Sequence, residues 1–190
     1  MKRVLTTLFV LAPAAALAHP GHHDHVHEHG GFLGGMAHPV GGADHLLAMI
    51  ALGLLAAQLG GRALWALPVS FVGSMLAGGM LGYLGIGFPA VEPMILASVI
   101  ILGALVAMAA RPPLTVLLPG VILFGLAHGW AHGAEGPTVG MAAYAGGFAL
   151  MTMGLHLAGI GTGKLLQSQA LSRILGGAAA LAGLALAFGG

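Results

Sequence analysis

The chain of 190 residues contains no cysteine, and only 6% of its residues are charged. The absence of cysteine excludes disulfide frameworks, thiolate zinc sites and iron–sulfur clusters. The scarcity of charge leaves no clustered basic face, which argues against nucleic acid as a partner. The side chains that remain for metal binding are 11 histidines, five carboxylates and ten methionines.

Hydrophobic residues make up 58% of the chain, and the mean hydropathy is +0.98. Too little polar surface remains to cover a water-soluble globule, so we predict an all-α integral membrane protein. The 34 glycines indicate helices that pack closely in lipid, where small residues let backbones approach. Three pairs of glycines spaced four apart fit such contacts: Gly78/Gly82, Gly129/Gly133 and Gly159/Gly163.

Residues 1–18 have the pattern of a secretory signal peptide. A basic start at Lys2-Arg3 precedes a short apolar segment and a small-residue A-x-A site that ends at Ala18. We therefore expect a mature chain that begins at His19. An uncleaved anchor helix is the alternative, although the apolar segment is short for a span.

Residues 19–35 are predicted to form a periplasmic tail. Within it, the stretch HPGHHDHVHEHG at 19–30 holds six histidines and two carboxylates and shows no hydrophobic period. Such a composition is typical of disordered tracts that collect divalent metals. The alternative is a solvated linker in which the histidines are incidental.

Residues 36–190 contain six apolar segments of about 20 residues, each long enough to cross a hydrocarbon core of about 30 Å. They lie near 38–60, 63–84, 92–110, 113–134, 138–160 and 170–189. Glycine, proline and charged residues separate them, as expected at helix boundaries. We predict one six-helix transmembrane domain.

The distribution of charge predicts how this domain is oriented. All basic residues of the mature chain fall on one side of the predicted membrane: Arg62, Arg111, Lys164 and Arg173. Glu92 and Glu135 fall on the other side. By the positive-inside rule, both ends of the mature chain face the periplasm of a bacterial inner membrane.

The first apolar segment opens with His38-Pro39-Val40-Gly41-Gly42-Ala43-Asp44-His45. An Asp at the middle of a membrane helix costs roughly 2.5 to 3.5 kcal/mol, so an ionisable residue there indicates a functional site. On one continuous helix, His38 and His45 would lie on nearly the same face, with His45 deeper in the membrane. Asp44 would then either bind a metal directly or be coupled to His45.

The fourth segment ends with His128, His132 and Glu135, whose i, i+4 and i+7 spacing places them on one helix face. At 1.5 Å per residue, His45 and His128 both lie roughly 10 Å below the external surface. The two groups therefore predict one ladder of donors between the first and fourth helices. Its outer members are His38, His132 and Glu135, and its deeper members are Asp44, His45 and His128.

Mixed imidazole and carboxylate donors suit Ni, Co, Zn or Cu(II) better than Ca or Mg. The alternative for an intramembrane histidine is a hydrogen bond between helices. We expect His156 to be isolated near the cytoplasmic end of the fifth segment. For this residue, a structural hydrogen bond and a role as a metal ligand on the exit path are equally good interpretations. Met151 and Met153 are interpreted as packing residues.

The two motifs also resemble those of a known family. His38, followed by five residues and then Asp44-His45, together with AHGWAHGAE at 127–135, resembles the signature motifs of the HupE/UreJ nickel or cobalt permeases. The resemblance implies uptake of nickel or cobalt for hydrogenase or urease maturation. It carries the pathway role over to the residues that match the motifs: His38, Asp44, His45, His128, His132 and Glu135. Some relatives have Phe where Ala127 stands here.

We expect a secondary permease, not an enzyme, with a divalent transition-metal ion as its substrate, the lipid bilayer as its surroundings and no permanently bound cofactor. No Walker-type phosphate loop is present. The alternatives are a membrane metalloenzyme with a di-iron-like His128/His132 site, a haem protein using His128 and His156, and an exporter of the same metals. The sequence leaves open whether the protein is a monomer or a homo-oligomer.

Overall fold

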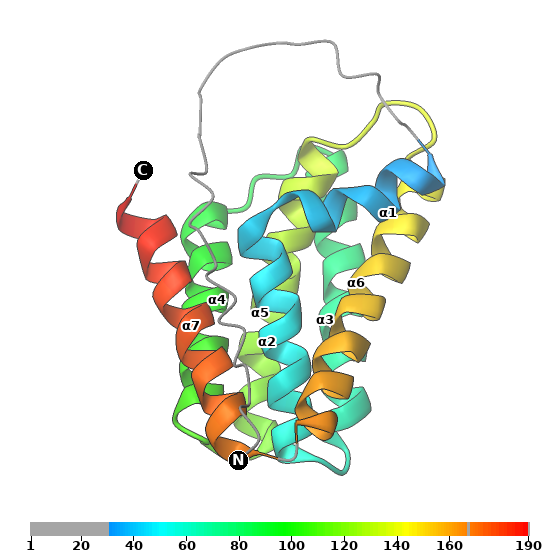
Figure 1. Cartoon of the computed structure of the whole chain (residues 1–190). Coiled ribbons are helices and arrows are strands. Elements are labelled where there is room, and N and C mark those ends of the chain that lie inside the picture. The colour runs from blue at the N-terminus through cyan, green and yellow to red at the C-terminus, as the bar shows by residue number, and fades with distance from the viewer. Residues whose placement is uncertain (1–30, 167, 190) are drawn as a thin grey trace, which may run out of the picture.

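A computed structural model describes residues 31–166 and 168–189 of the chain. The predicted signal peptide and the histidine-rich stretch 19–30 lie outside these residues. The described part is all helical, with seven helices and no strand (Figure 1). The helices are α1 (Phe32–Gly41), α2 (Ala43–Leu59), α3 (Ala63–Tyr83), α4 (Val91–Ala107), α5 (Leu114–Ala134), α6 (Met141–Leu165) and α7 (Gln169–Phe188).

The first predicted segment is not one continuous helix, which corrects the prediction. The chain bends by 87° between α1 and α2, and Gly42 at the break has an extended backbone. Pro39 lies inside α1 and lacks a backbone N–H, and the pair Gly41-Gly42 has little helical preference. As a result, α1 crosses one end of the bundle while α2 runs down its centre (Figure 1).

The remaining five predicted segments correspond to α3 through α7. Within the described residues, α3, α5, α6 and α7 are long and apolar enough to cross a membrane, and the bent pair α1 and α2 counts as a fifth span. Helix α4 is apolar but has 17 residues, which is at the lower limit for a span. Outward side chains are also apolar, as at Val116, Leu157 and Leu181. The prediction of an all-α membrane protein is confirmed.

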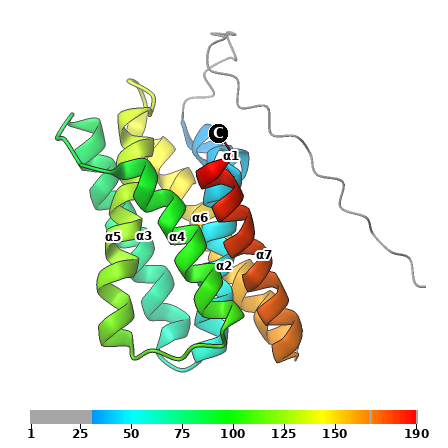
Figure 2. The same ribbon diagram turned by 90° about the vertical axis from the view of Figure 1, so that its left-hand side faces the viewer.

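Glycine contacts hold the helices together. Gly78 and Gly82 of α3 lie against the backbone of α5, while Gly129 and Gly133 of α5 lie against the backbone of α3. Gly159 of α6 approaches α2 in the same way. These contacts confirm the interpretation of the spaced glycines, because any Cβ at these positions would meet a neighbouring main chain. The other close helix pairs are α4 with α7 and α1 with α6 (Figure 2).

The bundle has two chemically different ends. The histidine end holds α1, the connection 84–90 and the connection 135–140, and the basic end holds the connections 60–62 and 108–113 (Figure 1). Glu92 and Glu135 lie at the histidine end. The basic end carries the charged side chains of Arg62, Arg111, Lys164 and Arg173. The predicted separation of charge is therefore present in the fold.

Candidate metal pathway

Four imidazoles from three helices form a continuous series of ring contacts. The bend at Gly42 brings His38 of α1 to His132 of α5, with ring centroids 4.6 Å apart. His132 contacts His45 of α2 at 4.3 Å, and His45 contacts His128 of α5 at 4.5 Å. We call His38, His132, His45 and His128, in this order, the histidine series. The two motifs found in the sequence thus meet, although His38 reaches the site from a separate helix.

Side-chain exposure differs between the outer and inner ends of the histidine series. His38 is exposed, His132 and His45 are 7% and 8% exposed, and His128 is completely buried. Among the described helices, α2 and α5 do not pack closely backbone to backbone, so the imidazoles occupy the space between them. The series therefore runs from the surface of the histidine end into the interior of the bundle.

Asp44 holds His45 in one orientation. Its Oδ1 accepts a hydrogen bond from the His45 backbone N–H at 2.8 Å and lies 2.9 Å from His45 Nδ1. A neutral imidazole that donates Nδ1–H to this carboxylate keeps the lone pair on Nε2. His45 Nε2 is buried and has no hydrogen-bond partner among the described residues. In this structure Asp44 is thus coupled to His45, one of the two arrangements that the sequence left open.

Ser98 of α4 orients His128 in a similar way. The Ser98 hydroxyl donates to the Ile95 carbonyl at 2.6 Å and lies 2.9 Å from His128 Nε2. Because the single hydroxyl hydrogen is used by Ile95, Ser98 Oγ accepts from an Nε2–H, and the lone pair of His128 stays on Nδ1. That Nδ1 is buried without a partner in the described part of the chain. Sequence reasoning missed Ser98, because a single serine in an apolar segment gives no signal of its own.

A cavity of about 260 Å³ opens beside the outer members of the series. Its polar lining comes from α1, α2, α4 and α5 and consists of His38, Asp44, His45, Glu92, His132 and Glu135. Five of the six predicted residues therefore share one cavity, and His128 lies beyond it. Glu92 is an addition to the predicted set, because its place in the sequence indicated only the orientation of the domain. Three carboxylates beside neutral imidazoles favour a dication over an anion.

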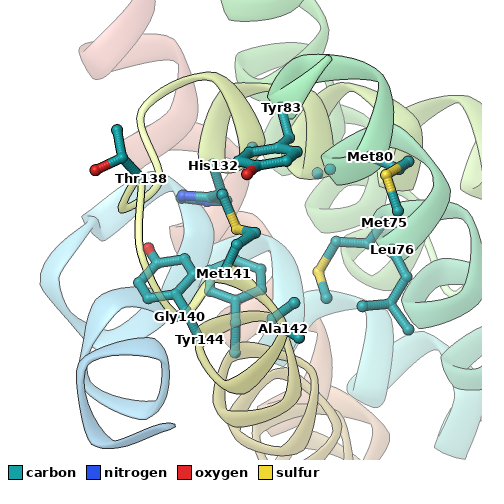
Figure 3. Close-up of a pocket in the computed structure, with 15 residues that line it drawn as sticks. Met75, Leu76, Met80, Tyr83, His132, Thr138, Gly140, Met141, Ala142 and Tyr144 are labelled. Atoms are coloured by element: carbon teal, nitrogen blue, oxygen red, sulfur yellow. The ribbon is translucent and has the colours of Figure 1, made fainter. Parts of the chain in front are cut away.

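His132 lies where this cavity meets the wider space between α3, α5 and α6. That second cavity, of about 580 Å³, is mainly apolar and is lined by methionines and tyrosines as well as His132 (Figure 3). Both ring nitrogens of His132 are buried and have no hydrogen-bond partner in the described residues. His132 is therefore the central imidazole of the site, in contact with His38 and His45 and free to use either nitrogen.

The donors form successive contacts and not a closed ion site. In the described ranges, no three His, Asp or Glu side chains surround a common point closely enough to hold an ion. The imidazoles instead meet edge to face, with interplanar angles of 85° for His38 with His132 and 84° for His45 with His128. Small ring rotations would be needed for two neighbouring imidazoles to share an ion.

The position of His156 differs from the prediction. It is completely buried in α6, and the Phe71 ring of α3 lies against both His156, at 5.3 Å, and His128, at 5.4 Å. The predicted position near a helix end was wrong, because α6 continues to Leu165, beyond the expected end near 160. The predicted isolation holds to the extent that neither ring nitrogen of His156 has a hydrogen-bond partner among the described residues. Phe71 is thus a common neighbour of His156 and of the innermost member of the histidine series.

Comparison with known proteins identifies the family of this chain. A family model described as HupE / UreJ protein matches residues 7–186. Protein HupE of Rhizobium leguminosarum bv. viciae is 44% identical over 192 residues, which cover 98% of each chain. No solved structure matches. The family match contains both motifs, helices α1 to α6 and most of α7, and the chain therefore belongs to the HupE/UreJ family.

Proposed function

We propose that this protein is a secondary permease that carries Ni²⁺ or Co²⁺ across the bacterial inner membrane into the cytoplasm, where the metal serves hydrogenase or urease maturation. The observation that carries the proposal is the histidine series, in which imidazoles from three helices make contact from the surface to the interior. Membership of the HupE/UreJ family supports transport and not catalysis.

Capture begins in the cavity at the histidine end. Glu92, Glu135 and Asp44 supply negative charge there, and their oxygens can replace some of the water around a dication. His38 is exposed at the same place and offers the first imidazole. Nickel and cobalt accept mixed nitrogen and oxygen donors, so the ion can exchange water for protein ligands in steps.

Transfer then follows the histidine series inward. His132 can bind through either nitrogen, His45 presents Nε2 because Asp44 holds Nδ1, and His128 presents Nδ1 because Ser98 holds Nε2. Neutral imidazole is the form that binds metal, and each of these free nitrogens is screened from bulk water. The lack of a closed three-donor site in the described residues agrees with passage, since an ion must bind weakly enough to leave.

The membrane potential supplies the driving force in this proposal. A dication that crosses 100 mV gains about 4.6 kcal/mol, which corresponds to accumulation of more than about a thousandfold. The positive-inside rule places the basic end in the cytoplasm and the histidine end, with both termini of the mature chain, in the periplasm. An ion entering at the histidine end then moves down the potential toward the basic end.

Uptake of radioactive nickel into cells that express the protein tests the proposal. We expect uptake above the empty-vector level, competition by cobalt, and loss of uptake in Asp44→Asn and His132→Ala at normal membrane levels. Leu181→Ala is the matched control, because Leu181 is 68% exposed on α7 and distant from the site. No uptake by the inserted native protein, or full uptake by both site variants, would contradict the proposal.

A further inference from the structure

Helix α6 carries two buried polar side chains that the histidine series does not use. Thr152 and His156 are both completely buried, and their i, i+4 spacing places them on one face of the helix. Thr152 Oγ1 and both ring nitrogens of His156 have no hydrogen-bond partner in the described part of the chain. Buried polar groups are nearly always paired, so three unpaired atoms on one helix face require an explanation.

The position of His156 is fixed by close packing. Gly53 of α2 and Gly159 of α6 approach so closely that a Cβ on Gly53 would meet the His156 carbonyl and the Gly159 Cα. The imidazole lies against the Phe71 ring, which also contacts the ring of His128. A purely structural histidine would use this rigid setting to make a hydrogen bond, but the described residues provide none.

We propose that His156 and Thr152 form an inner metal-binding site, which receives the ion from His128 after it passes Phe71. This inference rests on the proposed transport function. Imidazole nitrogen and hydroxyl oxygen suit a first-row divalent ion, and the imidazole is the stronger donor. Neither ligand is charged, so the ion is held weakly and can continue to the basic end. The site extends the pathway from the half of the bundle that contains the carboxylates into the other half.

The first test asks whether nickel uptake requires the His156 imidazole. In nickel-uptake assays, His156→Leu, which preserves bulk without a donor, should lower uptake by at least about tenfold, the scale expected when a metal-binding group is impaired. Nickel binding to the outer cavity of the purified variant should persist, which also shows that it is folded. Uptake at the native level in His156→Leu would overturn the inference, while absence of uptake in the native protein would instead overturn the proposed function.

The second test asks whether a metal ion can reach position 156, and it does not depend on transport. The chain has no cysteine, so His156→Cys introduces a single thiol whose cadmium complex has a sulfur-to-metal charge-transfer band. Leu157→Cys is the matched control on the next residue, which is 57% exposed on the outer face of α6. We expect the band in His156→Cys alone, and a weaker band when Thr152→Val is added. No band in His156→Cys, or an equal band in the control, would overturn the inference even if the leucine variant is unstable.

Discussion

Asp44 and Ser98 each hold one ring nitrogen of a pathway histidine and leave the other nitrogen free. The carboxylate does so for His45 at 2.9 Å, and the hydroxyl does so for His128 at 2.9 Å. The free nitrogens therefore differ, Nε2 on His45 and Nδ1 on His128, although the two rings are in contact. In the proposed pathway, these two hydrogen bonds therefore determine which nitrogen of each ring can bind a metal ion.

Ser98→Ala should impair transport without removing any imidazole. The variant leaves His128 Nε2 without its partner, so the ring can rotate or change tautomer, and we expect nickel uptake to fall by about tenfold. Ser74→Ala is the control, because the Ser74 hydroxyl makes the same kind of bond to a helix carbonyl but contacts no histidine. Equal uptake by the two variants would show that Ser98 does not position His128.

The bend between α1 and α2 shows what hydropathy could and could not predict at the scale of elements. The six apolar segments and both donor groups followed from the sequence, because apolar length and histidine spacing are local properties. The break at Gly42 did not follow, since Pro39 near the start of a segment also fits an ordinary helix beginning. Ser98 and the depth of His156 depend on tertiary packing and on where α6 ends.

Gly42→Ala should disturb the site through the bend. A Cβ on Gly42 would lie 2.9 Å from Asp44 Oδ1 and 3.2 Å from His45 Nδ1, so the pair that orients His45 must shift. We expect weaker nickel binding by the purified protein, measured by titration calorimetry. Gly41→Ala is the matched control, because a Cβ there meets nothing within 4 Å. Unchanged affinity in Gly42→Ala would contradict the role given to the bend.

Gly78→Ala should destabilise the contact between α3 and α5. The added Cβ would meet the Leu126 backbone, and overpacking of this kind costs about 1 to 3 kcal/mol. Thermal unfolding in detergent should therefore show a lower Tm. Gly73→Ala on the same helix has open space around its Cβ and should keep or raise the Tm. A Tm for Gly78→Ala equal to that of the control would be inconsistent with the packing described.

Across the whole described bundle, the carboxylates lie with four of the imidazoles at the histidine end, and arginine and lysine lie at the basic end. This asymmetry supports the proposed transport, because carboxylates at the histidine end attract a dication and an interior-negative potential would drive it toward the basic end. The charge pattern, read from the sequence, predicted this arrangement correctly because it depends only on the order and alternation of the helices.

Single thiols at the two ends should report the orientation in the membrane. Thr138 is exposed on the α5–α6 connection at the histidine end, and Ser168 is exposed just before α7 at the basic end. The two variants are Thr138→Cys and Ser168→Cys. A membrane-impermeant maleimide added to cells with a permeable outer membrane should label the first variant alone. Labelling of Ser168→Cys alone would show that the basic end faces the periplasm and would contradict the predicted orientation.

In the proposed function, the chain by itself conducts a divalent ion along its imidazoles under the membrane potential. Nickel uptake into liposomes that contain only the purified protein, with a potassium diffusion potential imposed, tests it most directly. We predict uptake when the interior is negative, loss of that uptake when the potential is collapsed, and little uptake by His132→Ala. Uptake that requires added nucleotide, or equal uptake by native protein and His132→Ala, would contradict the claim.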